Sequence, residues 1–200
     1  MIYNKNISNK QFKIATIIST YFGFGFAKFC PGTVGSLMTF PLFLLINILL
    51  TKLNIFSFYE LVLSYSLIFF IIFKFGLWSI NIYITKNNKK DPSEVVIDEV
   101  AGQFIAYVIP TVLTTYFFNF VLNDFIYNSI LLNLTSILMI TCPFIFFRLF
   151  DISKPGLVGY FDTKVEGAIG IMMDDVVAGI YSGLISSLIL ISFFIVMILC

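Results

Sequence analysis

The chain has 200 residues, of which 59% are hydrophobic and only 12% are charged, and its mean hydropathy is +0.99. Average soluble proteins are close to half apolar and about one quarter charged, so this chain lacks the polar residues needed to cover a surface in water. A formal net charge of +1 excludes the strongly basic surface that binds nucleic acid. The composition therefore predicts a membrane protein.

The residue types that are missing exclude several kinds of chemistry. The sequence has no histidine, so histidine triads, phosphohistidine intermediates and histidine-bound zinc are excluded within it. Cys30, Cys142 and Cys200 are far apart and form no C-x-x-C motif, which predicts neither a disulfide framework nor a thiolate metal site. We expect these cysteines to be reduced and buried. Residues 142–148 have the C-x5-R spacing of cysteine phosphatases, but phenylalanines in an apolar helix cannot wrap backbone amides around a phosphate, and we reject that interpretation.

Five apolar segments approach the length of about 20 residues that a helix needs to cross a bilayer. They cover approximately residues 34–50, 59–84, 95–118, 130–147 and 176–199. Lys74 lies inside the second segment, which a tilted helix or a position facing the bundle would explain, and Pro110 predicts a kink in the third. We therefore predict an all-α, polytopic membrane bundle of about five spans. It would form one domain over residues 1–200, with a short cytoplasmic segment at 1–13 and no evident secretory signal.

The basic residues predict how this bundle is oriented, because cytoplasmic loops of membrane proteins are enriched in lysine and arginine. Ten of the twelve basic residues fall on one side of the predicted spans. They are Lys5, Lys10, Lys13, Lys28, Lys86, Lys89, Lys90, Arg148, Lys154 and Lys164. Lys52 alone falls on the opposite side. We therefore expect the N-terminus to be cytoplasmic, the C-terminus to be outside, and any chemistry to face the cytoplasm.

A glycine-rich segment, GFGFAKFCPGTVGSL, leads into the first span at residues 23–37. Glycines allow backbone N–H groups to converge, and a helix N-terminus adds positive potential, so Thr33, Gly35 and Ser36 are candidates for binding a phosphate. The segment is not a Walker motif. A flexible turn capped by Thr33 or Ser36 would explain the same pattern.

Two later spans begin with similar sequences, VVIDEVAG and GIMMDDVVAG. Both helices run from inside to outside, so Asp98 and Glu99 are expected at the same depth as Asp174 and Asp175. Four converging carboxylates repel each other unless a cation lies among them, and oxygen ligands suit Mg²⁺. Acids at helix N-termini also complement the helix dipole, but this does not explain two consecutive acids in both helices. We predict that these four carboxylates bind metal.

Each acidic pair is followed by a glycine on the same helical face. Gly102 lies four residues beyond Asp98, and Gly179 lies four residues beyond Asp175. Small residues at these positions predict a close approach of neighbouring helices.

The segment FFRLFDISKPG contains Arg148, the only arginine of the chain. A guanidinium group can bind a phosphate with two parallel hydrogen bonds, which lysine cannot do. Arg148 and Lys154 are therefore candidates for binding phosphate, with Asp151 between them. A cytoplasmic anchor paired with Asp151 would also explain Arg148. Asp162 and Glu166 are weaker candidates, expected in a partly solvated loop.

Taken together, PGTVGSL, IDEVAG, FRLFDISKP and GIMMDDVVAG resemble the bacterial phosphatidylglycerophosphatase A family. The resemblance implies a Mg²⁺-dependent enzyme of the bacterial inner membrane that removes the terminal phosphate from phosphatidylglycerophosphate, giving phosphatidylglycerol. The chain departs from the family pattern twice. Ala27-Lys28 stands where Ser-Pro precedes the PGT motif, and Gly156 stands where a second proline follows KP. Lys28 could add a phosphate contact.

The sequence thus predicts a hydrolase that acts on a membrane phospholipid, with no identifiable protein partner. Asp98, Glu99, Asp174 and Asp175 would hold one or two Mg²⁺ ions, with Asp98 and Asp175 counted as catalytic. Arg148, Lys154 and residues 33–36 would receive the phosphate, and Asp151 would be a further metal ligand or would handle a proton. The alternative from another class is a divalent-cation channel or carrier whose path is lined by the acidic pairs.

Overall fold

The computed structural model describes residues 7–55, 57–121 and 129–199, and within these ranges it contains seven α-helices and one short 3-10 helix. The elements are α1 (Asn9–Ser19), η1 (Phe24–Phe26), α2 (Pro31–Lys52), α3 (Phe58–Asn87), α4 (Ile97–Val121), α5 (Ser129–Ser153), α6 (Leu157–Lys164) and α7 (Ala168–Leu199). The all-helical prediction is confirmed.

Five of these helices, α2, α3, α4, α5 and α7, are long and apolar enough to cross a membrane, which confirms the predicted count of spans. Their bounds differ from the prediction at the end that carries the polar motifs. Helix α5 continues to Ser153, and α7 begins at Ala168, well before its acidic pair. The apolar runs in the sequence end before the helices do, because backbone hydrogen bonding does not depend on apolar side chains and continues through the polar residues.

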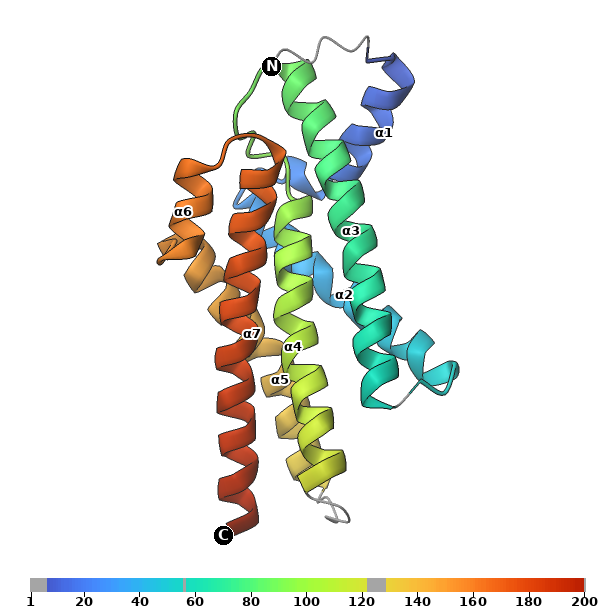
Figure 1. Cartoon of the computed structure of the whole chain (residues 1–200), viewed down its shortest axis with the longest axis vertical. Coiled ribbons are helices and arrows are strands. Elements are labelled where there is room, and N and C mark those ends of the chain that lie inside the picture. Colours follow the sequence, from blue (N-terminus) through green and yellow to red (C-terminus); the bar gives the residue numbers. More distant parts are fainter. Residues whose placement is uncertain (1–6, 56, 122–128, 200) are drawn as a thin grey trace.

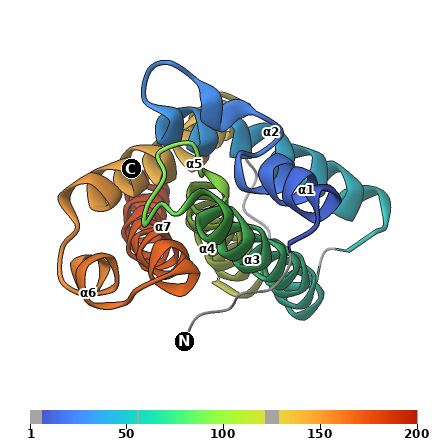
Figure 2. The same ribbon diagram turned by 90° about the horizontal axis from the view of Figure 1, so that it is seen from above.

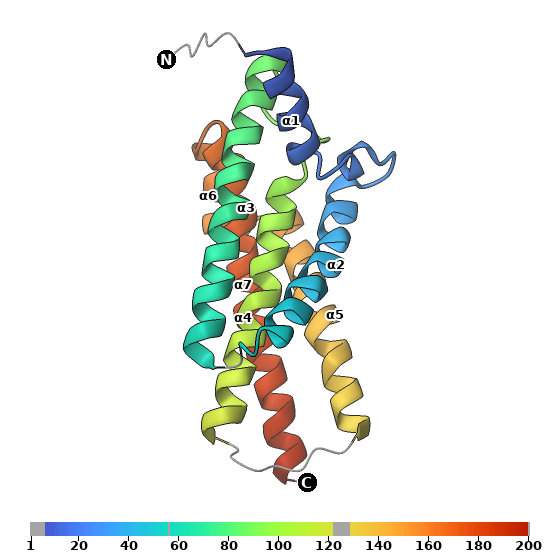
Figure 3. The same ribbon diagram turned by 90° about the vertical axis from the view of Figure 1, so that its right-hand side faces the viewer.

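Two short helices, α1 and α6, lie outside the predicted spans and were missed. Helix α1 begins with a capping box, in which the Ser8 side chain accepts from the backbone N–H of Gln11 and the Gln11 side chain accepts from the backbone N–H of Ser8. Helix α6 follows the turn at Gly156. Figures 1 and 3 show both helices toward the same end of the bundle, the end opposite the last turns of α7.

Helix α4 lies at the centre of the bundle, with α2, α3, α5 and α7 around it (Figure 2). Its closest neighbour is α7, because two glycines face each other where these helices cross. A Cβ atom added at Gly179 would lie 2.9 Å from the carbonyl carbon of Gly102. The close approach of these two helices, predicted from the glycine spacing, is confirmed.

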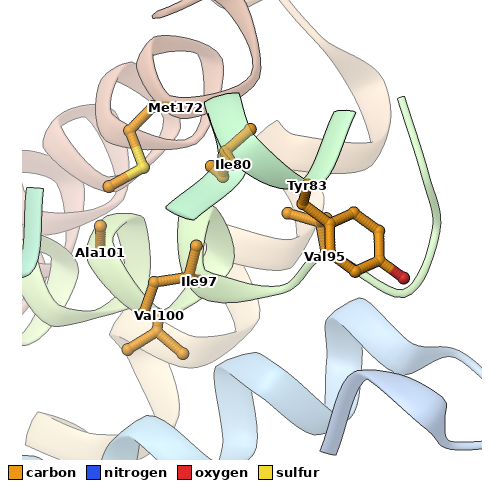
Figure 4. Close-up of a cluster of buried hydrophobic side chains, with 7 residues drawn as sticks. All are labelled: Ile80, Tyr83, Val95, Ile97, Val100, Ala101 and Met172. Atoms are coloured by element: carbon orange, nitrogen blue, oxygen red, sulfur yellow. The ribbon is translucent and has the colours of Figure 1, made fainter. Parts of the chain in front are cut away.

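Side chains from three helices close the bundle beside this crossing. Ile80 and Tyr83 of α3, Ile97 and Val100 of α4, and Met172 of α7 belong to one buried cluster (Figure 4). A second cluster joins α4, α5, α6 and α7, and is formed by Ala106, Phe147, Val158, Val177 and Ala178. These contacts fix the beginnings of α4 and α7 and the end of α5 relative to one another.

Polar residues within the spans are accommodated by local bonds. Helix α4 continues through Pro110, and the Thr114 hydroxyl donates to the Pro110 carbonyl at 2.6 Å. The Ser182 hydroxyl of α7 donates to the Pro143 carbonyl of α5 at 2.7 Å, which ties these two helices together. Lys74 is exposed on α3, with its Nζ 5.4 Å from the centre of the Phe70 ring, so the suggestion that it faces the bundle is wrong.

Candidate active site

A cavity of about 680 Å³ opens at the end of the bundle where α4 and α7 begin. Its walls come from the first turn of α2, the first turns of α4 and α7, the last turns of α5, and the two segments that precede α4 and α7. Eight of the predicted site residues line it, namely Thr33, Asp98, Glu99, Arg148, Asp151, Lys154, Asp174 and Asp175. Residues as far apart in the sequence as Thr33 and Asp175 thus meet at one place.

Three carboxylates form the centre of this cavity. Asp98 and Glu99 come from the first turn of α4, and Asp175 comes from the second turn of α7. One carboxylate oxygen from each of the three lies within 4.8 Å of the others. The glycine crossing explains this convergence, because it brings the backbones of α4 and α7 together one turn beyond the acids.

The three carboxylates fit a hard divalent cation. Asp98 Oδ1, Glu99 Oε2 and Asp175 Oδ1 are buried and have no hydrogen-bond partner among the described residues. Buried carboxylates without partners are costly, and proteins that keep them there usually pair them or use them to coordinate a metal. A set of oxygen donors alone suits Mg²⁺ or a similar ion rather than zinc or copper.

Asp174 lies in a different environment from the other three acids. Its Oδ2 accepts from Lys154 Nζ at 3.1 Å, and its Oδ1 accepts from the backbone N–H of Asp175 at 3.0 Å. It is not part of the group of three. Of the four carboxylates predicted to bind metal, three therefore converge and one is paired with lysine. A metal bond from Asp174 stays a prediction.

Lys154 connects the end of α5 to α6 and α7. It adopts a left-handed backbone conformation with φ of 47°, and its ammonium group donates to Asp162 as well as Asp174. Burial lowers the pKa of Lys154, but the hydrogen bonds and charges of Asp162 and Asp174 outweigh it, so the pKa is raised overall. Lys154 thus lines the cavity as a cation already held by two carboxylates.

Arg148 is held beside the three carboxylates with part of its guanidinium group unused. Its Nη1 lies 2.6 Å from Asp151 Oδ2 and donates to the Ser36 hydroxyl at 3.3 Å. Its Nε is buried and has no partner among the described residues. The pairing with Asp151, which the anchor alternative also requires, is present, and it leaves the buried Nε without a partner among the described residues.

Gly32, in the first turn of α2, is a site residue that motif matching did not single out. A Cβ atom there would collide with the Glu99 carboxylate and would lie 3.4 Å from Arg148 Nη1. The signal was present in the sequence as one of the clustered glycines at residues 23–37, but it was interpreted as a phosphate loop. Gly32 instead makes room for the side chains of Glu99 and Arg148.

Gly35 and Ser36 lie behind the cavity and do not line it. A Cβ atom at Gly35 would come within 2.9 Å of the Val96 side chain, so this glycine allows α2 to pack against the segment before α4. Ser36 is fully buried, and its hydroxyl donates to the Gly32 carbonyl at 2.8 Å while accepting from Arg148. Direct phosphate binding by these two residues stays a prediction, whereas Thr33 does line the cavity.

The segment before α4 adds two cations that sequence reasoning counted only toward orientation. Lys89 and Lys90 both line the cavity. Lys89 Nζ lies 2.6 Å from Glu94 Oε1, which also accepts from the Tyr83 hydroxyl at 3.2 Å. The hydrogen bond from Lys89 lowers the pKa of Glu94 below its ordinary value of 4.5.

Four further positions bear on the sequence predictions. Cys30 is exposed at the cavity and Cys142 is partly exposed, so the expectation that the cysteines are buried is wrong for these two, and Cys200 lies outside the described residues. Lys28 does not line the cavity. Gly156 has φ of +57°, which a proline ring cannot adopt, so the departure from the family pattern after KP goes with a different turn.

The fold and the cavity define a multi-pass membrane protein with a carboxylate-rich site at one end of its bundle. Residues 17–190 match the phosphatidylglycerophosphatase A family, and the chain belongs to this family of lipid phosphatases.

Curated relatives from bacteria cover most of the chain. A protein of Bacteroides thetaiotaomicron, named provisionally as a phosphatidylinositol-3-phosphatase, is 31% identical over 84% of this chain and 89% of its own. Phosphatidylglycerophosphatase A of Escherichia coli K12 is 26% identical over 90% of this chain and 87% of its own. Phosphatidylglycerophosphatase A of Haemophilus influenzae is 54% identical over a shorter stretch, 22% of this chain and 26% of its own. No solved structure shows a significant match.

Proposed function

We propose that this protein removes the terminal phosphate from phosphatidylglycerophosphate in a Mg²⁺-dependent hydrolysis, giving phosphatidylglycerol for anionic phospholipid synthesis. The observation that carries the proposal is the position of Arg148. Its guanidinium group lies in the same cavity as three unpartnered carboxylates and keeps a buried donor free. A phosphate monoester can be bound by a metal ion held by the carboxylates and by a guanidinium group, and the cavity offers residues for both.

Each side chain has a distinct role in this proposal. Asp98, Glu99 and Asp175 would hold Mg²⁺, which when bound polarises a phosphoryl oxygen and activates water. Arg148 binds the phosphate oxygens, and Thr33 adds a hydroxyl from the first turn of α2. The hydrolysis breaks the bond between phosphorus and the ester oxygen, adds the oxygen of water to phosphorus, and leaves a proton on the glycerol hydroxyl.

Asp151 is placed to orient Arg148 and to transfer a proton. It holds Arg148 at 2.6 Å and is near enough to Glu99 and Asp175 to interact with both electrostatically. We propose that it orients the guanidinium in the resting site. When phosphate takes over Arg148, the released Asp151 carboxylate can accept the proton that the attacking water loses and pass it to the leaving oxygen.

We place the site at the cytoplasmic face of a bacterial inner membrane. Support comes from the sequence, which has ten basic residues on one side of the predicted spans. Helices α1 and α6 and the cavity lie at the end of the bundle that carries those of the ten that the structure describes. The C-terminal end of α7 lies at the opposite end (Figure 1).

A second substrate deserves a direct comparison, because the Bacteroides relative is named for a 3-phosphoinositide. Both lipids carry a phosphate monoester beyond a phosphodiester, so the same metal and arginine could serve either. The cation channel considered from the sequence has less support. The chain belongs to a phosphatase family, and no acidic or basic residue follows Asp175 in the remainder of α7.

The test is phosphate release by purified protein in detergent, measured in parallel with phosphatidylglycerophosphate and phosphatidylinositol 3-phosphate. We expect release from the first lipid with Mg²⁺, loss of release with excess EDTA, and recovery when Mg²⁺ is restored. Preference for the phosphoinositide would replace the proposed substrate while keeping the site. Release that EDTA does not affect would contradict the metal assignment.

Glu60→Gln is the matched control for a variant that removes a site carboxylate, such as Asp175→Asn. Glu60 is a carboxylate in the first turn of α3, at the end of the bundle away from the cavity, and glutamine can keep its capping bond to Ser57. Its phosphate release should equal that of the unmodified protein, which would separate the loss of a site carboxylate from the loss of any carboxylate.

A further inference from the structure

The rim of the cavity has two chemically different sides. On one side lie charged and polar residues from the segments before α4 and α7, including Lys90, Asp91 and Glu166. On the other side lie Cys30 and Pro31 at the start of α2 and Ile152 near the end of α5. Ile152 is 73% exposed although it lines the cavity, so an exposed apolar side chain forms part of the rim on this side.

The apolar side of the rim continues along the outer surface of α5. Ile145, Leu149 and Ile152 are spaced by four and three residues, which places them on one helical face, and all three are more than half exposed. This stripe (residues 145, 149 and 152) runs from within the span to the cavity. Leu37, on the neighbouring turns of α2, is also exposed.

The same side of the rim is flanked by an aromatic segment. Phe29, which directly precedes Cys30, is 85% exposed, and Phe22, Phe24 and Phe26 are exposed as well. Lys28 is exposed between them. Exposed phenylalanines beside a lysine, at the end of a membrane-spanning helix, combine an apolar surface that suits the edge of the bilayer with a cation that suits the headgroup region. The apolar rim therefore lies at the level where phospholipid headgroups meet the acyl chains.

We propose that the lipid substrate enters the cavity sideways from the bilayer, between the start of α2 and the end of α5. Its acyl chains lie along the stripe on α5, and its glycerol backbone passes over Ile152. The charged phosphate then reaches Arg148, which lies one helical turn from Ile152 on the same face of α5. The polar side of the rim faces water and releases inorganic phosphate.

The occupant of this surface follows from the chemistry on each side of Ile152. Toward the cavity are a guanidinium group and three carboxylates that suit a metal-bound phosphate, and away from it is an apolar stripe in contact with the bilayer. A molecule that satisfies both must have an anionic head joined to acyl chains. The inference rests on the proposed function, because it uses the assignment of the cavity as the phosphatase site.

The experiment compares two forms of phosphatidylglycerophosphate with the protein in nanodiscs. One is the dioleoyl lipid incorporated in the disc, and the other is the dihexanoyl analogue added as a soluble monomer. The measured quantity is the ratio of kcat/KM for the long-chain lipid to that for the short-chain analogue. We expect Ile152→Asn and Leu149→Asn each to lower this ratio by about tenfold, since an apolar contact with the chains is lost.

The matched control is Ile169→Asn. Ile169 is an exposed isoleucine at the same end of the bundle, near the start of α7, and it does not line the cavity. Its ratio should equal that of the unmodified protein. Because the readout is a ratio, partial loss of folded protein lowers both activities equally and does not imitate the expected result.

The outcomes separate this inference from the proposed function. An unchanged ratio in both α5 variants overturns the lateral entry, even though the phosphatase assignment stands. An equal fall of the ratio in Ile169→Asn also overturns it, because the effect would then be general to the membrane surface. If the unmodified protein hydrolyses neither substrate, the proposed function itself fails.

Discussion

The two acidic pairs, at Asp98-Glu99 and Asp174-Asp175, have nearly the same sequence but different structural environments. On α4 both acids belong to the group of three carboxylates, whereas on α7 only Asp175 does and Asp174 pairs with Lys154. The difference comes from where each pair lies in its helix. The α4 pair occupies the first turn, and the α7 pair lies one turn further in.

Helix geometry explains why similar motifs give different arrangements. Consecutive residues on a helix point about 100° apart, so two neighbouring acids cannot both point directly at one ion. On α4 the second acid is a glutamate, whose longer side chain can reach back toward the cavity. On α7 the second acid, Asp175, converges with the two carboxylates of α4. Asp174, whose side chain is shorter than that of a glutamate, pairs with Lys154 at the end of α5 instead. The motif therefore predicts a shared location but not a shared role.

The largest expected effect on activity comes from the acidic pair on α7, whose two members have different environments. Asp175→Asn removes one of the three converging carboxylates, and we expect phosphate release to fall by more than about 100-fold, since loss of even an outer partner of a metal site typically costs 10- to 100-fold. Asp174→Asn keeps all three carboxylates and should lose less. The measurement is kcat/KM for both variants at saturating Mg²⁺.

Both variants need a folding control, which the elution volume and the helical circular dichroism of the purified proteins provide. Equal losses in two folded variants would mean that Asp174 also holds the metal and that the four predicted ligands act together. A fully active Asp175→Asn would remove this residue from the site.

The next effect concerns the glycine crossing that brings the two pairs together. Gly179→Ala places a Cβ atom against the Gly102 backbone, 3.1 Å from its Cα, where no side chain can move aside. We expect a loss of about 1–3 kcal/mol or more in the free energy of unfolding, as for overpacked cores. Thermal unfolding in detergent measures it.

Gly76→Ala is the matched control for this crossing. The new Cβ atom there would lie 2.5 Å from Met172 Cε, the far end of a flexible side chain that can turn away. Its unfolding temperature should fall less than that of Gly179→Ala. The reverse order would show that the Gly102–Gly179 contact tolerates a methyl group, and the convergence of the carboxylates would need another explanation.

The sequence predicted the fold class, the five spans and the meeting of the candidate site residues at one end of the bundle, but not the short helices outside the spans. The apolar runs are long enough to reveal five spans, and the acidic pairs and the single arginine are conspicuous because charges are rare in this chain. Helices α1 and α6 were missed because they are short and lie outside the spans, where hydropathy carries little signal. The role of Gly32 could not be predicted, because its neighbours Glu99 and Arg148 meet it only through tertiary packing.

A substitution of Arg148 is expected to have a smaller effect, through weaker binding of the substrate phosphate. Arg148→Lys keeps the positive charge but loses the second parallel hydrogen bond and the buried Nε donor. We expect kcat/KM to fall by an amount that corresponds to about 1–3 kcal/mol. Steady-state kinetics measures this, and an unchanged kcat/KM would reduce Arg148 to a membrane anchor paired with Asp151.

A substitution of Lys154 tests how much its pairing with Asp174 stabilises the protein. Lys154→Gln leaves the largely buried Asp174 carboxylate without its cation, and we expect a loss of about 1–3 kcal/mol in the free energy of unfolding. The double variant with Asp174→Asn should recover part of this loss, because the unpaired charge is gone. Additive losses in the double-mutant cycle would show that the two side chains do not interact energetically.

The smallest effect concerns the ion pair of Lys89 and Glu94, in the segment before α4. Lys89 is more exposed than Lys154, with 53% of its side chain accessible compared with 32%, so its bond to Glu94 should contribute only about 0.2–1 kcal/mol. The lowered pKa of Glu94 sets the sign of the pH dependence. A carboxyl group whose pKa is lowered by folding stabilises the protein above its unfolded pKa, and this contribution is lost as the pH falls through the folded value.

The expected observation is therefore a small difference in unfolding temperature between the unmodified protein and Glu94→Gln at pH 7, which shrinks as the pH falls below about 4. A difference that grows on acidification would have the wrong sign for this pair. A difference at pH 7 as large as that for Lys154→Gln would mean that the exposed bond between Lys89 and Glu94 stabilises the protein as strongly as the more buried pair of Lys154 and Asp174.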